Sequence, residues 1–345
     1  MTDRYDVTII GGGPAGLFSA FYSGLRGMKT KIIEFQPKLG GKVLLYPEKM
    51  IWDAGGQPPV LGEIFAKQLV QQGMTFQPTV CTNEKVDLIE KDENEDFIIT
   101  THNGNKHYSK SVIVAIGGGI IQPKPLQVEG AEKYVGKNLH YTVNDLRQFR
   151  DKVVMISGGG DSAVDWAAEL LYIAKKVYIV SRRDKLSAHE ALVKRLESSS
   201  ATIVTNSRIN GLVGDADQIN QVLLEDIHSG TITAQDIDYL IVNHGYNQDS
   251  SFELGSDLSL EMKDDYFFLG NPQGYTSEDG IFAAGDILAY DGKVNLLIGA
   301  FQDAVNAVNS AKTYLEPSAT KIAMVSSHNE AFDEQNEKLK REMLR

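Results

Sequence analysis

The chain has 345 residues but only one cysteine, Cys81. An intramolecular disulfide and a zinc site built from several cysteines are therefore excluded. No hydrophobic run approaches the roughly 18 apolar residues of a membrane-spanning helix, and the first residues have no basic-then-apolar signal pattern. The net charge of −12 argues against a nucleic-acid-binding protein. These absences predict a cytoplasmic protein with neither a membrane nor a nucleic acid as partner.

Glycine is abundant, and the first glycine-rich loop follows the apolar stretch YDVTII and precedes a helical pattern over residues 14–26. Gly11, Gly13 and Gly16 complete the pattern G-x-G-x-x-G in the order strand, loop, helix, which is typical of a dinucleotide site. The free N–H groups at the start of the helix would face the pyrophosphate. Glu34 ends the next predicted strand, at the spacing expected for an acid that binds ribose hydroxyls.

The strand–loop–helix unit occurs a second time, in KVVMISGGGDSAVDWAAELLYI. Here Gly158, Gly160 and Ala163 give the related pattern G-x-G-x-x-A. The next predicted strand, KVYIV, ends before Ser181, which is as far from Ala163 as Glu34 is from Gly16. The chain therefore contains an internal repeat with two expected dinucleotide sites.

The two units differ in charge after this second strand. Ser181 replaces the acid, and Arg182 and Arg183 follow it. A carboxylate would repel a 2′-phosphate, whereas arginine binds one with charge-assisted hydrogen bonds. The first loop is thus expected to hold a dinucleotide with free ribose hydroxyls and the second NADPH. Two such sites predict a flavoprotein with resident FAD.

The fold class expected from this pattern is α/β, with the NADPH domain inserted into the FAD domain. The FAD domain is predicted to comprise residues 1–119 and 279–345, including a C-terminal extension. The NADPH domain is predicted to comprise residues 120–278, between the linker-like stretches IQPKPLQVEG and LGNPQGYTSEDG. A helical pattern covers residues 293–315.

The order GGGPAGL, VAIGGG, SGGGDSAVDWA, SRRD and IFAAGDI resembles the low-molecular-weight thioredoxin reductases over nearly the whole chain. Their redox-active cysteine pair is expected just before the second glycine unit, where this chain has HYTVNDL. LYPEK, HYTVNDL and RRDKLSAHE are similar to segments of the thioredoxin-reductase-like ferredoxin–NADP⁺ reductases, which lack the pair. This resemblance implies a homodimer with one FAD per subunit, in which electrons pass from NADPH through FAD to ferredoxin or flavodoxin.

The resemblance also implies the residues of the FAD site. Those of the pyrophosphate loop and the ribose site are Gly11, Gly13, Pro14, Ala15, Gly16 and Glu34. Further FAD contacts are implied for Lys42, Tyr46, Val86, Gly117, Ile121 and Asp286. Among these, Tyr46 matches the aromatic residue that stacks on the isoalloxazine, and Asp286 matches the acid that binds the ribityl chain. Lys42 and Ile121 depart from the residues usual in the family.

The NADPH site and the C-terminal extension are assigned in the same way. The implied NADPH contacts are Gly158, Gly160, Asp161, Ser162, Ala163, Arg182 and Arg183, while Ser187 stands where a third arginine is frequent. Ser327 and His328 match a hydroxyl and an imidazole beside the second flavin face, although a histidine in a polar tail is also commonly just solvated.

Hydride transfer between nicotinamide and flavin needs no side-chain acid or base, so we expect no catalytic dyad and no metal. Because a ferredoxin partner is usually acidic, a local positive patch is required, for which Lys38, Lys42 and Lys49 are candidates. Two alternatives remain at this point. One is an NADPH-dependent flavin diaphorase or oxidase with another acceptor, and the other is a non-catalytic FAD- and NADPH-binding redox sensor.

Overall fold

The computed structural model describes residues 3–143, 145–249, 252–323 and 325–344. The chain forms two compact units. Unit 1 comprises residues 1–120 and 248–345, and unit 2 comprises residues 121–247. Unit 2 is therefore an insertion into unit 1, which agrees with the predicted order of the domains along the chain.

Unit 1 is built on a five-stranded parallel sheet. Its strands in spatial order are β24 (Ile281–Ala283), β10 (Val112–Val114), β2 (Val7–Ile10), β3 (Thr30–Ile33) and β6 (Thr79–Cys81). All five strands are short, and β24, β10, β2 and β3 are completely buried, as expected of a parallel sheet covered on both faces. Their carboxyl ends lie at one edge, which is where ligands of such sheets bind.

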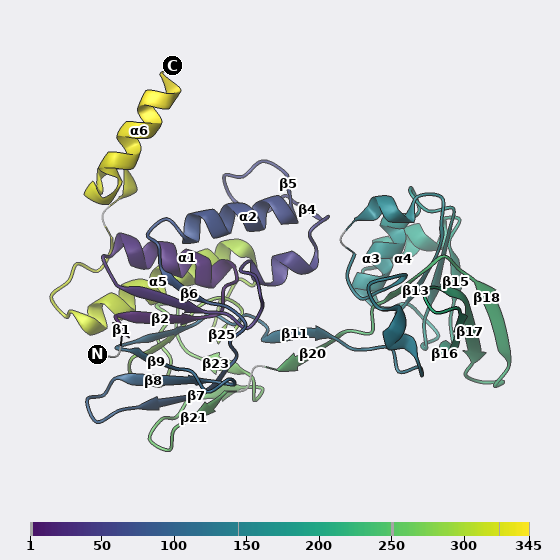
Figure 1. Cartoon of the computed structure of the whole chain (residues 1–345), viewed down its shortest axis with the longest axis horizontal. Coiled ribbons are helices and arrows are strands. Elements are labelled where there is room, and N and C mark those ends of the chain that lie inside the picture. The colour runs from purple at the N-terminus through teal and green to yellow at the C-terminus, as the bar shows by residue number, and fades with distance from the viewer. Residues whose placement is uncertain (1–2, 144, 250–251, 324, 345) are drawn as a thin grey trace. The chain divides into compact units, whose positions relative to one another are not determined.

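Two different layers cover this sheet (Figure 1). One face packs against the helices α1 (Pro14–Leu25), α2 (Gly62–Gly73) and α5 (Leu297–Leu315). The other packs against an antiparallel sheet of β7 (Val86–Lys91), β8 (Phe97–Thr101) and β9 (Lys106–Ser109), with β1 (Arg4–Tyr5) and β21 (Glu253–Leu254) at its edges. Successive residues alternate between the layers, since Ile9 faces the helices and Ile10 faces the antiparallel sheet.

Smaller elements complete unit 1. They are η1 (Gly41–Leu45), the hairpin β4 (Met50–Ile51) and β5 (Val60–Leu61), the sheet of β22 (Met262–Lys263), β23 (Phe267–Leu269) and β25 (Leu288–Ala289), the turns η4 (Ser326–His328) and η5 (Glu330–Phe332), and α6 (Asp333–Met343). Within the part of the chain that the structure describes, no helix has the length and apolar character needed to cross a bilayer.

Unit 2 repeats the same layers. Its parallel sheet has the order β12 (Leu139–His140), β19 (Tyr239–Val242), β13 (Val153–Ser157), β14 (Lys176–Val180) and β15 (Thr202–Val204). It also contains α3 (Asp161–Leu170), α4 (Glu190–Glu197), the turns η2 (Ala131–Tyr134) and η3 (Leu146–Phe149), and an antiparallel sheet of β16 (Ser207–Gly214), β17 (Ile219–Asp226) and β18 (Ile232–Asp236). Two short strands, β11 (Ile120–Pro123) and β20 (Tyr246–Asp249), pair where the chain passes between the units. The predicted pair of Rossmann-like units is thus present.

The second predicted domain boundary differs from the structure. Unit 2 ends at residue 247, which is 31 residues (278 − 247) before the predicted boundary. The proline- and glycine-containing stretch 269–280 is not a linker, because it packs on α5. Asn306 donates to the Pro272 carbonyl at 2.7 Å, and Ser310 donates to the Gln273 carbonyl at 2.8 Å. Local composition indicated a loop correctly, but not the helix that the loop contacts.

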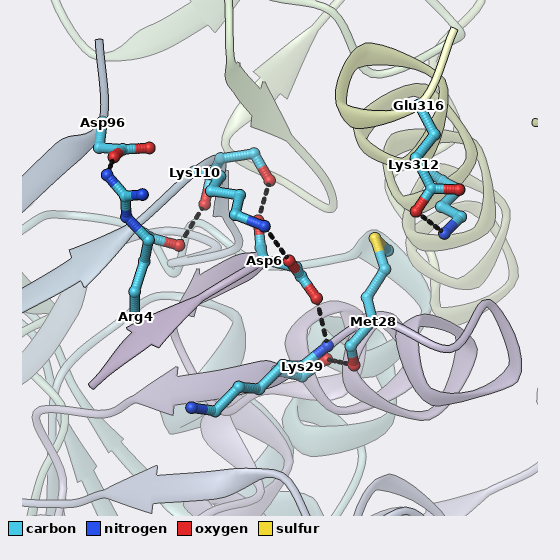
Figure 2. Close-up of polar contacts among 11 residues, drawn as sticks. Arg4, Asp6, Met28, Lys29, Asp96, Lys110, Lys312 and Glu316 are labelled. Carbon is cyan, nitrogen blue, oxygen red and sulfur yellow. Dashed lines mark hydrogen bonds and ion pairs between the residues drawn. The ribbon is translucent and has the colours of Figure 1, made fainter. Parts of the chain in front are cut away.

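The strand predicted over residues 5–10 is interrupted at Asp6, where the chain moves from the antiparallel sheet to the central one. Figure 2 shows the Asp6 carboxylate accepting hydrogen bonds from Lys110 Nζ at 2.8 Å and from the Lys29 N–H at 2.9 Å. Partial burial opposes ionisation, but these two donors outweigh it and lower the pKa of Asp6. Asp6 therefore joins three segments at the amino ends of the strands, opposite the expected ligand edge.

Candidate nucleotide-binding sites

The first glycine loop joins β2 to α1 through three glycines with different surroundings. Gly11 has φ +106°, and a Cβ there would lie 2.5 Å from the Ala115 carbonyl oxygen. A Cβ on Gly16 would lie 1.9 Å from the Gly11 carbonyl oxygen, so only glycine allows this approach of helix to strand. At Gly13 the nearest atom would be the Gly41 Cα at 3.6 Å. Gly11 and Gly16 serve packing within the loop, and an added Cβ on Gly13 would be in ordinary van der Waals contact with the backbone of Gly41.

The start of α1 is suited to an anion. Gly13 is the N-cap residue and makes no side-chain capping bond in the described structure, and the first turn contains no acidic residue. Pro14 occupies the first turn, where its missing N–H costs nothing. The remaining N–H groups and the helix dipole therefore favour an anion at this helix start, as a pyrophosphate would be.

Glu34 lies directly after β3 and is almost completely buried beside this loop. Its two carboxylate oxygens accept hydrogen bonds from the Gly12 N–H at 2.6 Å and the Gln36 N–H at 2.7 Å. Burial raises the pKa of Glu34, although both N–H groups act in the opposite direction. A carboxylate has about four acceptor positions, so Glu34 retains capacity for ribose hydroxyls.

Two more predicted residues lie near this edge. Gly117 follows β10, has φ +59° and would find no atom within 4 Å of an added Cβ. Asp286 follows β24 and is half-buried. The preceding residue, Gly285, packs on the first turn of α1, since a Cβ there would lie 2.9 Å from the Ala15 Cβ. The parallel strands thus bring both residues to the edge occupied by the first loop.

The segment that contains Lys42 and Tyr46 crosses the loop. The Gly40 N–H donates to the Gly12 carbonyl at 2.8 Å, and a Cβ on Gly41 would lie 2.6 Å from the Gly13 Cα. Lys42 is exposed in η1, and Tyr46 ends that turn half-buried. The sequence analysis did not identify these two glycines as part of the site, although the pair Gly40-Gly41 is itself a signal of close backbone approach.

Two predicted contacts lie farther along the chain. Val86 is buried at the start of β7, two residues after Glu84, whose N–H donates to the Glu34 carbonyl at 3.0 Å. The segment that contains Val86 therefore runs beside Glu34. Ile121 lies in β11, and its side chain falls outside the described part of the structure.

The second glycine loop has the same construction. Gly158 has φ +148°, and a Cβ there would lie 2.4 Å from the Asn243 carbonyl oxygen. Ala163 is buried in α3, and Gly160, the N-cap residue of α3, has no atom within 4 Å of an added Cβ. Asp161 is exposed, Ser162 is half-buried, and Asp161 Oδ1 accepts a hydrogen bond from the His189 N–H at 3.0 Å. Gly160 leaves space for an anion, although the first turn of α3 contains the acid Asp161, unlike the first turn of α1.

Arg182 and Arg183 are exposed just beyond β14. Arg183 Nη1 donates to Ser187 Oγ at 3.0 Å, and the Ser187 N–H donates to the Gly159 carbonyl at 2.6 Å. Ser187 therefore ties the arginine segment to the second glycine loop. This contact accounts for serine at the place where the resemblance implies a third arginine.

The sequence analysis did not identify His244, which lies beside the second glycine loop. His244 follows β19, and its Nε2 lies 2.8 Å from Ser157 Oγ at the end of β13. Burial lowers the pKa of His244, and the charge of Arg182 lowers it further. The sequence offers no motif for His244, because its place depends on the pairing of two strands far apart in the chain.

The C-terminal extension is fixed at the far end of α1. The Ala323 N–H donates to the Tyr22 hydroxyl at 3.3 Å, and Asn329 Nδ2 donates to the Leu25 carbonyl at 3.5 Å. Since α1 has 12 residues, this end lies about 18 Å from the glycine loop. Ser327 and His328 are exposed there, so the fold does not bring them to the first loop of their own chain.

A cluster of buried and half-buried polar side chains lies near the first glycine loop. Cys81, Glu84 and His107 form the only group of three potential metal ligands found among the described residues. However, Lys31 Nζ lies 3.0 Å from His107 Nδ1, and His107 Nε2 lies 2.8 Å from Glu84 Oε2. Lysine and glutamate balance each other's charge, so the cluster is satisfied without a cation. The cysteine is half-buried, and burial raises the pKa of its thiol.

Comparisons with known proteins agree with these two loops. Residues 5–311 match the family model described as pyridine nucleotide-disulphide oxidoreductase. The chain is 56% identical over 338 residues to ferredoxin–NADP reductase 3 of Lysinibacillus sphaericus, covering 97% of each chain. It is 54% identical over 344 residues to ferredoxin–NADP reductase 2 of Exiguobacterium sibiricum, covering 99% of this chain and 98% of the other. Among solved structures, thioredoxin reductase of Lactococcus lactis matches with a TM-score of 0.70 and 26% identity, over 90% of this chain and 99% of that one.

Proposed function

Because this chain belongs to the pyridine nucleotide-disulphide oxidoreductase family, and within it to the ferredoxin–NADP reductases that resemble thioredoxin reductases, we propose that it transfers electrons between NADPH and ferredoxin through a bound FAD. The observation that carries this proposal is the charge difference between two glycine loops of the same strand–loop–helix construction. Glu34 lies beside the first loop, and Ser181 followed by Arg182 and Arg183 lies beside the second.

The first loop fits FAD. Gly13 and the start of α1 would hold the pyrophosphate, and Glu34 would accept from the ribose hydroxyls of the adenosine. Asp286 would accept from the ribityl chain, and Tyr46 would cover one face of the ring. When bound, FAD supplies the chemistry, because a flavin accepts a hydride and releases electrons singly.

The second loop fits NADPH. Gly160 and the start of α3 leave room for its pyrophosphate. The exposed guanidinium groups of Arg182 and Arg183 would bind the 2′-phosphate, and Ser187 would hold Arg183 in place. The work of the chain is to bind and orient the two nucleotides, and no proton transfer by a side chain is required.

The electron acceptor must be outside this chain. With Cys81 as the single cysteine, the protein cannot cycle an internal disulfide, unlike a thioredoxin reductase with its cysteine pair. Lys38, Lys42 and Lys49 lie on the segment that crosses the first loop, and we propose that they form the positive surface for an acidic carrier, ferredoxin or flavodoxin, in the cytoplasm.

We also propose a homodimer. Ser327 and His328 are expected beside the flavin, but their own chain holds them at the far end of α1. If they meet a flavin, it must be the flavin of a second copy. The polar, exposed α6 that follows them would extend this contact.

The experiment is NADPH-driven cytochrome c reduction by the FAD-loaded protein, with and without added ferredoxin or flavodoxin, beside an NADH control. The proposal predicts a rate that depends on the carrier and falls at least tenfold with NADPH in Arg182→Ala, with little change for NADH. Arg208→Ala is the matched control, because that exposed arginine pairs with Glu225 on the antiparallel sheet of the same unit.

The alternatives give different results. Rapid reduction of the flavin by NADPH without stimulation by either carrier would indicate a diaphorase or oxidase with another acceptor. Failure of NADPH to reduce the flavin, combined with a nucleotide-dependent change in oligomeric state, would indicate a redox sensor. Either result would contradict the ferredoxin proposal and leave the two nucleotide sites in place.

A further inference from the structure

A buried ion pair holds both polar groups of Gly285. Asp303, on α5, has a fully buried side chain, and the side chain of Lys293 is 8% exposed. Asp303 Oδ2 accepts from the Gly285 N–H at 3.1 Å and contacts Lys293 Nζ. The same lysine donates to the Gly285 carbonyl at 2.8 Å. One acid and one base thus satisfy the donor and the acceptor of a single residue.

Tyr290 completes this network. Its hydroxyl donates to the second oxygen, Asp303 Oδ1, at 2.8 Å. Burial and the bond to the carboxylate raise the pKa of Tyr290 to about 12, so it remains a donor at any working pH. Each oxygen of the buried Asp303 therefore has a donor, which is the condition under which a buried charge is tolerated.

The network fixes the turn that presents Asp286. Gly285 has φ +77° and lies against Ala15 in the first turn of α1. Because a peptide group is planar, the bond from Lys293 to the Gly285 carbonyl sets the orientation of the whole Gly285–Asp286 peptide. The Leu288 N–H donates to the same carbonyl at 3.0 Å. The turn is thus held from beneath by an ion pair rather than by loop contacts alone.

We propose that Asp303 and Lys293 are positioning residues of the flavin site. In the pair, the opposite charges of the two side chains cancel each other's effect on the flavin bound beside Asp286, and this cancellation sets the reduction potential of that flavin. The inference rests on the proposed function, since it requires FAD at the first loop. Charges act strongly in a buried, weakly polarisable environment. An unpaired Lys293 would favour the more negative, reduced flavin, whereas an unpaired Asp303 would disfavour it.

The test separates charge from shape. Asp303→Asn and Lys293→Gln each remove one charge from the FAD-loaded protein and keep a polar side chain, although Asn exchanges one acceptor for a donor and Gln is shorter than Lys. The double variant removes both charges. Glu316→Gln is the matched control, because this acid pairs with Lys312 on the same helix and is 58% exposed. The midpoint potential of the flavin is measured by equilibration with a reference dye, and FAD release is followed by flavin fluorescence.

We expect the potential to become more positive in Asp303→Asn, more negative in Lys293→Gln and nearly native in the double variant and the control. FAD release should be at least tenfold faster in each single variant. Equal potentials in all proteins, or shifts of the same sign in the two single variants, would overturn the inference. They would show that the network only stabilises the fold.

Two further results keep the test decisive. If Asp303→Asn does not fold, the sign of the shift in Lys293→Gln and the unchanged potential expected of Tyr290→Phe still decide the question. If the wild-type protein binds no FAD, the proposed function fails and this inference fails with it. If it binds FAD that NADPH does not reduce, only the proposed function fails, because the midpoint potential is measured against a dye and not with NADPH. A normal wild-type flavin with unresponsive variants contradicts the inference alone.

Discussion

Ser181 occupies in unit 2 the position that Glu34 occupies in unit 1. A Cβ on Gly12 would lie 3.1 Å from Glu34 Oε2, and a Cβ on Gly159 would lie 2.6 Å from Ser181 Oγ. Each side chain also accepts from the N–H two residues later, Gln36 at 2.7 Å and Arg183 at 3.1 Å. The two positions therefore share their place beside the glycine loop and differ in charge, which is the difference expected between a ribose diol and a 2′-phosphate.

An acid placed at residue 181, as at Glu34 in unit 1, should reverse the preference for NADPH over NADH. In Ser181→Glu a carboxylate would face the 2′-phosphate, so we expect KM for NADPH to rise at least tenfold while KM for NADH stays within about threefold. Steady-state cytochrome c reduction with both nucleotides measures this. Ser181→Ala is the control, since it loses only the bond to the Arg183 N–H and should keep the preference for NADPH. Equal losses with both nucleotides in Ser181→Glu would place the phosphate elsewhere.

The glycines of the second loop should separate folding from binding. Gly158→Ala would place a Cβ 2.4 Å from the Asn243 carbonyl oxygen at φ +148°, so it should lower the free energy of unfolding by about 1–3 kcal/mol. Gly160→Ala meets no atom within 4 Å and should change stability by less than about 0.5 kcal/mol. NADPH affinity should nevertheless fall in Gly160→Ala, because the methyl group occupies the space above the loop. Urea unfolding and NADPH titration measure the two effects, and an unchanged affinity would argue against pyrophosphate at Gly160.

These glycines also show what sequence alone can predict. Both strand–loop–helix units are local patterns, and the distance from Gly16 to Glu34 recurs from Ala163 to Ser181 within one chain. Repetition of a local signal therefore revealed the fold class and the two nucleotide loops. The functions of individual site residues remain predictions that need the experiments described above.

What the sequence could not predict depends on packing between distant segments. The stretch 269–280 has a linker-like composition, yet a Cβ on Gly274 would lie 2.8 Å from the Ala307 Cα of α5. The pairing of Lys293 with Asp303 has no local signal, because a lysine ten residues before an aspartate is ordinarily a solvated pair of charges. In both places the decisive fact is which surface the helix α5 presents, and that is set by the whole of unit 1.

Acid should weaken the network at Asp6. The folded-state pKa of Asp6 is lowered, so its contribution is complete above about pH 4 and is lost as pH falls through the folded value. Asp6→Asn should therefore be less stable than wild type at pH 7, by no more than about 1 kcal/mol because solvent screens this partly exposed pair, and the difference should shrink toward pH 3. Urea unfolding at several pH values measures it. In a cycle with Lys110→Gln, strictly additive losses would contradict an interaction between the two side chains.

The attachment of the C-terminal extension should depend on Phe332. Its ring lies 6.4 Å from the ring of Phe21 on α1 and 5.3 Å from that of Phe76, measured between centroids. Phe332→Ala removes this apolar contact, so residues 326–343 should exchange amide hydrogens at least tenfold faster while the sheet of unit 1 is unchanged. Leu339→Ala is the control, because that side chain on α6 is 50% exposed. If Phe332→Ala leaves exchange unchanged, the backbone bonds to Tyr22 and Leu25 suffice to hold the extension. If the extension detaches and flavin release also accelerates, the result would favour contact of Ser327 and His328 with the flavin of a second copy.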